Sequence, residues 1–270
     1  MTMEAQALER LIALVQASQI GHPGTDTPTM LVPAGYELAS LEHYQAAPSR
    51  FRGIFSTRAI GDFAAYVNAE DQAQAFIDID RMRAVALFDL GTSQAPGHGE
   101  HRALLELKKT APFAACLEAN GNAFTQKELA HFIEDWHGHI EGESTTGQSL
   151  SPQQLANLVR RIEIKANSER THEDGDWNAK RTGLDAIDAS AGTDTPAVIR
   201  FSCLPYEGLK VRTFDLRVSI LTDADKPRIK LRIMGLEGIQ EEIGQEFKQV
   251  LDGELDSDSV TLLLGGFCKD

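Results

Sequence analysis

The sequence predicts an α+β fold, in which hairpins form antiparallel or mixed sheets and several amphipathic helices pack on them. One observation is that short segments with alternating apolar and polar residues come in neighbouring pairs, as the strands of hairpins do. A second is that longer segments place apolar residues three or four positions apart, which is typical of helices with one buried face. Strands and helices do not alternate regularly, so a parallel βαβ fold is disfavoured.

Length and charge bound the class of protein. A chain of 270 residues can bury the core of one domain, so we expect a single domain over 1–270, with a candidate sub-boundary near 145–150. A net charge of −14 disfavours nucleic acid and anionic membranes as general partners. The N-terminal segment lacks the basic region of a signal peptide, and no segment has the apolar length of a membrane span. We therefore expect a cytoplasmic protein.

The N-terminal part of the chain supplies a helix, a strand and a hairpin. A first helix is predicted over 4–19, where apolar residues fall at helical spacing. The segment RFRGIFS indicates a strand, and Ser56 or Thr57 is expected to cap the helix that follows through Phe63 and Val67. AFIDID and AVALFDLG indicate a hairpin, and the loop GTSQAPGHGEH then leads into the strand HRALLELKK.

The middle of the chain is predicted to be mainly helical. Pro112 is expected to begin a short helix, and Thr125 caps a longer one predicted over 126–141. The segment GESTTGQSLSP indicates a loop, after which Ser151 caps a further helix. A variable polar segment follows at about 170–197, where the sequence favours neither a loop nor a pair of strands.

The C-terminal third has the clearest pattern. LKVRTFDLRVSI and RIKLRIM alternate apolar and polar residues, which predicts an antiparallel hairpin. A helix is predicted over 239–250, and SVTLLLGGF indicates a final buried strand. The three cysteines, Cys116, Cys203 and Cys268, are far apart and have apolar neighbours, so we expect reduced and mostly buried thiols.

Four stretches resemble a known family. LVPAGYELASLE, PSRFRGIFSTRAIGDFAAYVN, FDLGTSQAPGHGEHRALLELKKT and FTQKELAHFIEDW are similar to phage and prophage proteins with the YfdQ-like domain of unknown function. The likeness runs in order over most of the chain and is weakest at about 165–200. It implies a phage-encoded accessory protein made in the bacterial host's cytoplasm. It implies no activity, cofactor or catalytic residue.

The loop that ends in HGEHR looks more like an active site than any other segment. His98 and His101 have the spacing of two zinc ligands, although the sequence shows no third ligand beside them. The alternative is a contact loop, because the connection is about twice the common length of roughly five residues. We favour a contact loop and expect neither a metal nor a cofactor. Its candidate residues are His98, Glu100, His101 and Arg102.

Two other sets of titratable residues could carry chemistry. On the helix predicted over 126–141, one side contains His131, Asp135 and His139. These could form a His–Asp acid–base pair, or they could belong to a solvated helix face. Strands near the first hairpin carry Asp78, Asp80 and Asp89. Such carboxylates could bind Mg²⁺, or they could lie on exposed strand faces.

Basic residues define candidate anion-binding sites. If the apolar residues of the C-terminal hairpin face the core, its other face carries Arg217, Arg228, Lys230 and Arg232. A second candidate surrounds an aromatic residue and consists of Arg50 and Arg52, which could contact phosphate. The alternative in both places is a solvated charged surface with ion pairs.

Three hypotheses of function follow. The sequence contains no P-loop, no G-x-G-x-x-G and no G-x-S-x-G motif, so we expect a protein that is not an enzyme. The first hypothesis is an accessory protein that acts as a homo-oligomer, or that binds an anionic small molecule or a host protein. The second is a DNA-transaction accessory factor that binds single strands or ends. The third is a metal-dependent hydrolase.

Overall fold

The computed structural model describes residues 3–19, 42–48, 50–162, 195–221 and 228–267, which fall into two units, 1–51 and 52–270. The first unit contains helix α1 (Met3–Gln19) and the 3-10 helix η1 (Glu42–Tyr44). The helix predicted over 4–19 is therefore confirmed. Its apolar residues Leu8, Leu11 and Ile12 are exposed. The polar segment at about 170–197 lies almost entirely outside the described residues.

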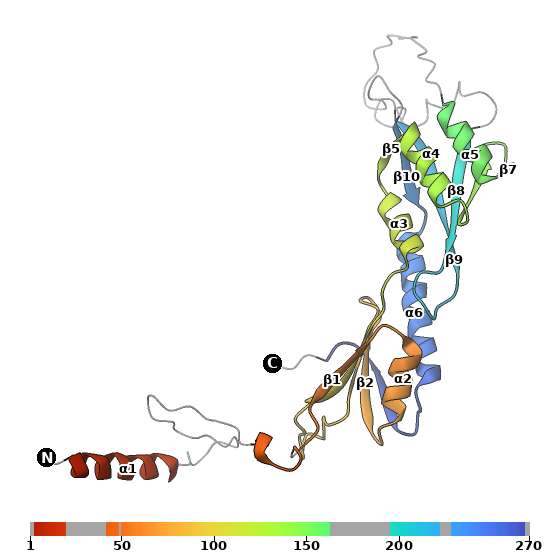
Figure 1. Ribbon diagram of the computed structural model, residues 1–270. Coiled ribbons are helices and arrows are strands. Elements are labelled where there is room, and N and C mark those ends of the chain that lie inside the picture. The colour runs from red at the N-terminus through yellow and green to blue at the C-terminus, as the bar shows by residue number, and fades with distance from the viewer. Residues whose placement is uncertain (1–2, 20–41, 49, 163–194, 222–227, 268–270) are drawn as a thin grey trace, which may run out of the picture. The chain divides into compact units, whose positions relative to one another are not determined.

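The second unit contains a mixed sheet of five strands in the order β1-β4-β3-β2-β11 (Figure 1). The bounds of these strands are β1 Gly53–Thr57, β2 Ala73–Asp78, β3 Arg83–Leu87, β4 His101–Glu106 and β11 Val260–Leu264. The predicted strands β2, β3 and β4 pair antiparallel, whereas β1 joins β4 and β11 joins β2 in parallel. The predicted final strand is confirmed as β11, but its predicted burial is wrong, because β11 lies at the sheet edge and Leu263 and Leu264 are exposed.

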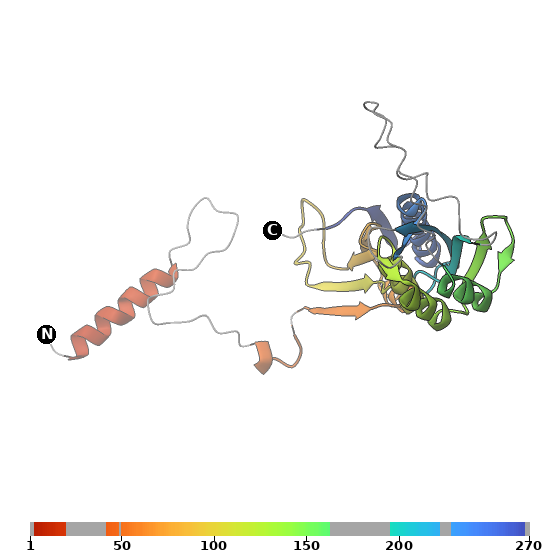
Figure 2. The same cartoon turned by 90° about the horizontal axis from the view of Figure 1, so that it is seen from above.

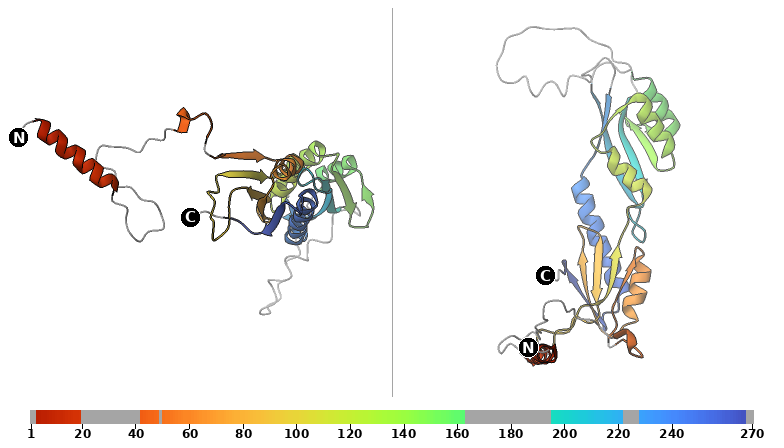
Figure 3. Two further views of the ribbon diagram at one scale, coloured as in Figure 1. Left: turned by 90° about the horizontal axis from the view of Figure 1, so that it is seen from below. Right: turned by 60° about the vertical axis from the view of Figure 1, so that its left-hand side comes forward.

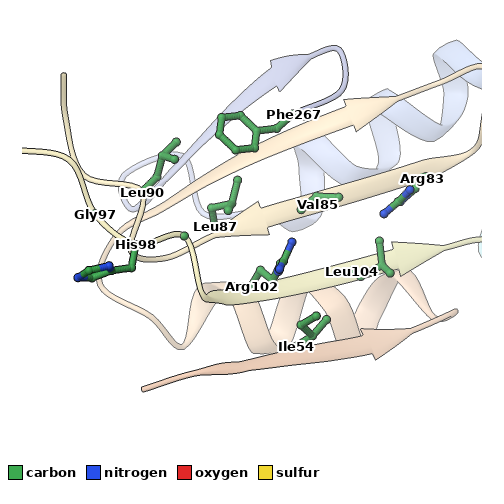
Figure 4. Close-up of a pocket in the computed structure, with 11 residues that line it drawn as sticks. Ile54, Arg83, Val85, Leu87, Leu90, Gly97, His98, Arg102, Leu104 and Phe267 are labelled. Carbon is green, nitrogen blue, oxygen red and sulfur yellow. The ribbon is translucent and has the colours of Figure 1, made fainter. Parts of the chain in front are cut away.

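One face of the mixed sheet is buried under helices. Alternation along β4 turns Ala103 and Leu105 into the core and leaves Arg102 and Leu104 on the opposite, outer face. Helices α2 (Ile60–Asn68) and α6 (Leu236–Glu254) lie behind the sheet when it is viewed from that outer face (Figure 4). The predicted capping of α2 is wrong. Its N-cap is Ala59, which has no side-chain cap, and the Thr57 hydroxyl instead accepts a bond from the Ala59 N–H at 3.1 Å.

The second sheet of this unit is antiparallel throughout and has six strands in the order β5-β10-β9-β8-β6-β7. Their bounds are β5 Ala123–Thr125, β6 Ile140–Ser144, β7 Ser149–Leu150, β8 Pro196–Cys203, β9 Arg212–Leu221 and β10 Arg228–Ile233. The predicted C-terminal hairpin is confirmed as β9 and β10. The segment predicted as a loop before Ser151 is instead the end of β6 and the strand β7.

Three helices accompany the antiparallel sheet: α3 (Ala111–Ala119), α4 (Gln126–Asp135) and α5 (Pro152–Arg160). Helices α4 and α5 lie side by side on one face of the sheet (Figure 2). Capping boxes start both helices, at Thr125 and Ser151, as the sequence predicted for Thr125. The predicted helix 126–141 is too long. It ends at Asp135, and Ile140 pairs with Phe201 in the sheet.

Helix α6 joins the two sheets, because the chain runs from β10 through α6 to β11 (Figure 3). Arg212 of β9 donates to Glu242 at 2.5 Å and to Glu246 at 2.8 Å, both on α6. The buried Glu246 also accepts the backbone N–H of Lys210 at 2.7 Å. The hydrogen bond to Glu246 raises the pKa of Arg212, so the guanidinium stays charged. Among the described residues, we find no helix with the length and apolarity that crossing a membrane requires.

Candidate functional site

The outer face of β9 and β10 carries the predicted cations. Phe214, Leu216, Ile229, Leu231 and Ile233 are buried, as the alternation predicts. The opposite face carries Arg217, Arg228, Lys230 and Arg232, all of them exposed. We call these four residues the cationic face. Sequence alternation was sufficient to find it.

The register of the hairpin brings positive charges of the two strands close together. Arg217 of β9 stands directly opposite Arg232 of β10, and Lys230 stands opposite Ser219. Within the described residues no carboxylate forms an ion pair with Arg217, Lys230 or Arg232. Like charges directly opposite one another destabilise an antiparallel pair, so this arrangement opposes folding slightly.

The neighbouring strand carries an arginine that, unlike these three cations, has carboxylate partners. Arg200 of β8 pairs with Glu143 of β6, and its Nε lies 3.6 Å from Asp215 of β9. Arg228, at the far end of the cationic face, donates from its Nη1 to the backbone oxygen of Ala123 at 3.0 Å. Within the described residues, Arg217, Lys230 and Arg232 are therefore the cations of this face whose side chains have neither a carboxylate nor a backbone oxygen as partner.

The two arginines of the second predicted anion site, Arg50 and Arg52, have different surroundings. Arg50 belongs to the first unit of the chain and Arg52 to the second. The Nε of Arg52 donates to Glu100 at 3.0 Å, so this charge has a carboxylate partner. The same Glu100 belongs to the predicted contact loop, which is thereby linked to the start of β1.

The contact loop is closely bonded to the end of β3. The Asp89 carboxylate accepts the backbone N–H groups of Glu100 and His101 at 3.2 and 3.1 Å. Gly97 donates its backbone N–H to Leu90 at 2.8 Å. A Cβ atom at Gly97 would lie 1.8 Å from the backbone oxygen of Asp89, so only glycine fits there.

The step from His101 to Arg102 places the two side chains on opposite faces of the mixed sheet. His101 is buried at 8% exposure, and its Nε2 lies 3.0 Å from the Tyr66 hydroxyl of α2. Its ring also packs on Phe88, with centroids 4.4 Å apart. The structure thus gives His101 a core position, whereas His98 is exposed on the loop. The two histidines do not converge on one site.

A cavity of about 220 Å³ lies on the outer face of the mixed sheet. Its floor and walls come from β1, β3, β4, the contact loop and the C-terminal segment (Figure 4). Its apolar lining consists of Ile54, Val85, Leu87, Leu90, Leu104 and Phe267. Two arginines, Arg83 and Arg102, complete it together with the loop residues Gly97, His98 and Gly99. Figure 4 shows the His98 ring turned away from Arg102.

The two arginines of this cavity differ in their surroundings. Arg83 stands between Asp78 of β2 and Glu106 of β4 in the register of the sheet. Arg102 stands between Ile54 of β1 and Leu87 of β3, both apolar. Within the described residues, the Nε of Arg102 is buried and has no hydrogen-bond partner. The sequence located Arg102 but could not show the cavity, which needs β1 beside β4 and Phe267 on β2.

The predicted acid–base groups are separated by the fold. His131 and Asp135 are exposed on α4, but His139 lies beyond the end of that helix. The His139 Nδ1 lies 2.8 Å from the backbone oxygen of Ser202, and its ring stacks on Phe201 with centroids 5.7 Å apart. The expected row of three residues along one helix is therefore wrong.

The three aspartates do not gather either. Asp78 and Asp80 precede β3, whereas Asp89 follows it, so the strand separates them. Asp78 accepts the backbone N–H of Arg81 at 3.1 Å. Across the described ranges, there is no group of three or more His, Cys, Asp or Glu side chains that could hold a metal ion. The hydrolase hypothesis gains no support from them.

Two cysteines lie in the core of the second unit. Cys116 of α3 and Cys203 of β8 are free and buried. Burial raises the pKa of Cys116 to about 12 and that of Cys203 to about 11, so both are thiols rather than thiolates at neutral pH. The prediction of reduced, buried thiols is confirmed for these two, while Cys268 lies outside the described residues.

The comparison with protein families identifies the family to which the chain belongs. A family model described as an uncharacterised conserved protein, DUF2303, matches residues 1–267, so the chain belongs to this family. No curated protein matches the chain, and no solved structure does.

Proposed function

We propose that this member of the DUF2303 family acts by binding and assembly rather than by catalysis, and that its cationic face binds a phosphate-bearing anion. One observation carries the proposal. Arg217 stands opposite Arg232 beside Lys230, and no described carboxylate pairs with any of the three. Carboxylates are abundant in a chain of net charge −14, so the lack of such pairs leaves these cations available to a ligand.

The chemistry of the three cations favours phosphate. Arginine presents a planar fork of N–H donors that fits two phosphate oxygens, and lysine adds a compact point charge. Three positive charges match an anion that carries several negative charges in a short length. The net charge of −14 repels a long polyanion, which favours a small polyphosphate or a nucleotide as the ligand.

Calorimetric titration with tripolyphosphate at low ionic strength tests this proposal. The double variant Arg217→Met/Arg232→Met is expected to bind about tenfold more weakly or worse, because charge-assisted hydrogen bonds are lost. Arg160→Met is the matched control, since Arg160 pairs with Glu134 among the helices and lies outside the cationic face. An absence of binding, or an equal loss in both variants, contradicts the proposal.

A DNA-transaction role is the second candidate, and the geometry of β10 is the observation that favours it. Alternate residues on a strand repeat every ~6.8 Å, so Arg228, Lys230 and Arg232 form a row with that spacing. This equals two steps of a stacked nucleotide strand at roughly 3.4 Å each. Titration with a thymidine oligonucleotide over a range of salt concentrations tests it. Three or four phosphate contacts predict a slope of log K against log salt of roughly −2 to −3.

Assembly through α1 is the third part of the proposal. An isolated helix of 17 residues is marginal in water, and Leu8, Leu11 and Ile12 expose an apolar stripe that a second copy can cover. Native mass spectrometry is expected to show a homo-oligomer that Leu8→Glu/Leu11→Glu dissociates and Arg10→Glu leaves intact. A strict monomer contradicts this part.

The resemblance to YfdQ-like proteins supports an origin in a phage or prophage, and hence synthesis in the cytoplasm of a bacterial host. An accessory protein of this kind could act on a host protein, which the cationic face would have to contact through acidic side chains. Mass spectrometry of host cells before and after prophage induction tests the origin. The abundance of the protein is expected to rise on induction.

A further inference from the structure

The mixed sheet has an outer face that the described helices of the second unit leave open. Across it, the register sets Ile54, Arg102 and Leu87 side by side in one row, and Leu104 beside Val85 in the next. The exposed fraction of Ile54 is 58% and that of Phe267 is 37%. Antiparallel sheets usually present polar residues to water on their open face, so apolar side chains around a cavity need another explanation.

The position of Arg102 supplies that explanation. Its guanidinium lies over the apolar floor of the cavity of about 220 Å³, and within the described residues its buried Nε has no acceptor. A buried donor without a partner is unfavourable, and an acceptor brought by a ligand would remove that penalty. Arg83, at the other end of the cavity (Figure 4), has Asp78 and Glu106 on its two neighbouring strands. Arg102 is therefore the arginine of the cavity that has no carboxylate on either neighbouring strand.

We propose that this cavity binds a small amphipathic carboxylate, with its anionic group on Arg102 and its apolar body over Val85, Leu87 and Leu104. A single carboxylate carries the one negative charge that Arg102 can neutralise, whereas a phosphate dianion would leave a charge among apolar side chains. The guanidinium fork donates hydrogen bonds to both carboxylate oxygens, and the apolar body covers the exposed Ile54 and Phe267. The volume limits the ligand to a short aliphatic or single-ring acid. This site is separate from the cationic face, and neither proposal depends on the other.

Titration of the full chain with octanoate, followed by amide NMR shifts and calorimetry, tests the site. We expect one molecule bound per chain, with the shifts concentrated at Val85, Leu87 and Leu104. Octanol, which has the same apolar body without the charge, is expected to bind about tenfold more weakly or worse. Scattered shifts, more than one bound molecule per chain or equal binding of octanol overturn the proposal.

Matched arginine variants locate the anion. Arg102→Met is expected to weaken octanoate binding about tenfold or more, whereas Arg83→Met, with the same change in an arginine of the same cavity, leaves it within about twofold. The reverse order, or equal loss in both, overturns the assignment to Arg102.

A variant that keeps Arg102 but fills the cavity gives an independent check. Val85 lies on the outer face and is half-buried, so Val85→Trp can occupy the cavity without entering the core. It is expected to abolish octanoate binding while leaving tripolyphosphate binding at the cationic face unchanged. Octanoate binding that survives Val85→Trp places the ligand elsewhere and overturns the proposal.

Discussion

The two sheets of the second unit differ in the faces they leave open. The antiparallel sheet exposes charged residues, among them Arg217, Lys230 and Arg232, which water solvates well. The mixed sheet exposes an apolar cavity that contains Arg102, whose Nε is buried. Water hydrates the charged side chains of an open face, so such a face is stable without a ligand. On an apolar face, water does not reach a buried donor, and the hydrogen bond of that donor stays unmade. The contrast predicts different responses to substitution and to salt.

The largest expected effect tests whether the two sheets unfold as one unit. Glu246→Gln leaves Arg212 with one exposed carboxylate partner, so the expected loss is about 3 kcal/mol, the lower end of the range for breaking a buried ion pair. We expect a single urea transition at a much lower midpoint. Two transitions would show that the link through α6 holds together sheets that fold separately.

Glu242→Gln is the control for this link. Glu242 bonds the same arginine, but its side chain is 67% exposed, so the expected loss is below about 1 kcal/mol. Equal losses for the two variants would mean that burial of Glu246 is not the source of the effect.

The next effect concerns the wall of the cavity. Gly97→Ala puts a Cβ atom 1.8 Å from the Asp89 backbone oxygen, so we expect a loss of about 3 kcal/mol in the free energy of unfolding. Gly61→Ala in α2 meets no atom within 4 Å and is the control, expected to be neutral or to stabilise by up to about 1 kcal/mol. Urea denaturation of both variants measures the difference. A Gly97→Ala protein as stable as wild type would show that the contact loop is not held as described.

A third effect tests the core beneath the antiparallel sheet. The unfolded chain loses the Cys116 proton near its ordinary pKa of 9.0, whereas the folded protein keeps it until about 12. Stability from this thiol is therefore complete below pH 9 and is lost as the pH rises towards 12, by about 1 kcal/mol per pH unit. Cys116→Ala is expected to show a smaller loss than wild type between pH 9 and 11 in thermal unfolding. Parallel curves for the two proteins contradict the burial of this thiol.

Sequence alternation predicted the open faces better than it predicted the sites on them. The polar and apolar positions of β4, β9 and β10 followed from a period of two, so Arg102, Arg217 and Arg232 could be placed on outer faces. The opposition of Arg217 and Arg232 needs the register of the hairpin. Residues 222–227, which connect the two strands in the sequence, lie outside the described residues.

The features that the sequence did not predict depend on pairing between segments that are far apart in the chain. The cavity forms because Ile54 of β1 lies on one side of it and Phe267, which packs on Phe76 of β2, lies on the other, and local patterns carry no information about the pairing of such remote segments. His139 was assigned to a helix because Phe132, Trp136 and Ile140 continue the helical spacing. The chain instead leaves the helix at Asp135, since Ile140 is buried by pairing with β8.

The smallest expected effects compare the two open faces directly. Arg102→Met removes a buried donor that has no partner among the described residues, so we expect the unfolding free energy to rise by about 1 kcal/mol. Arg217→Met removes a like-charge contact with Arg232, so we expect a rise of about 0.5 kcal/mol at low salt. Both variants are measured by urea denaturation in low and in high salt.

Salt separates the two causes. Repulsion between the exposed Arg217 and Arg232 is screened, so the gain from Arg217→Met is expected to vanish near 1 M salt, where the Debye length is about 3 Å. The gain from Arg102→Met comes from relieving an unsatisfied buried donor, which mobile ions do not reach, and is expected to persist. If both gains disappear in salt, the Arg102 guanidinium is solvated like the cationic face. The mixed sheet then has no unsatisfied donor that a carboxylate would bind.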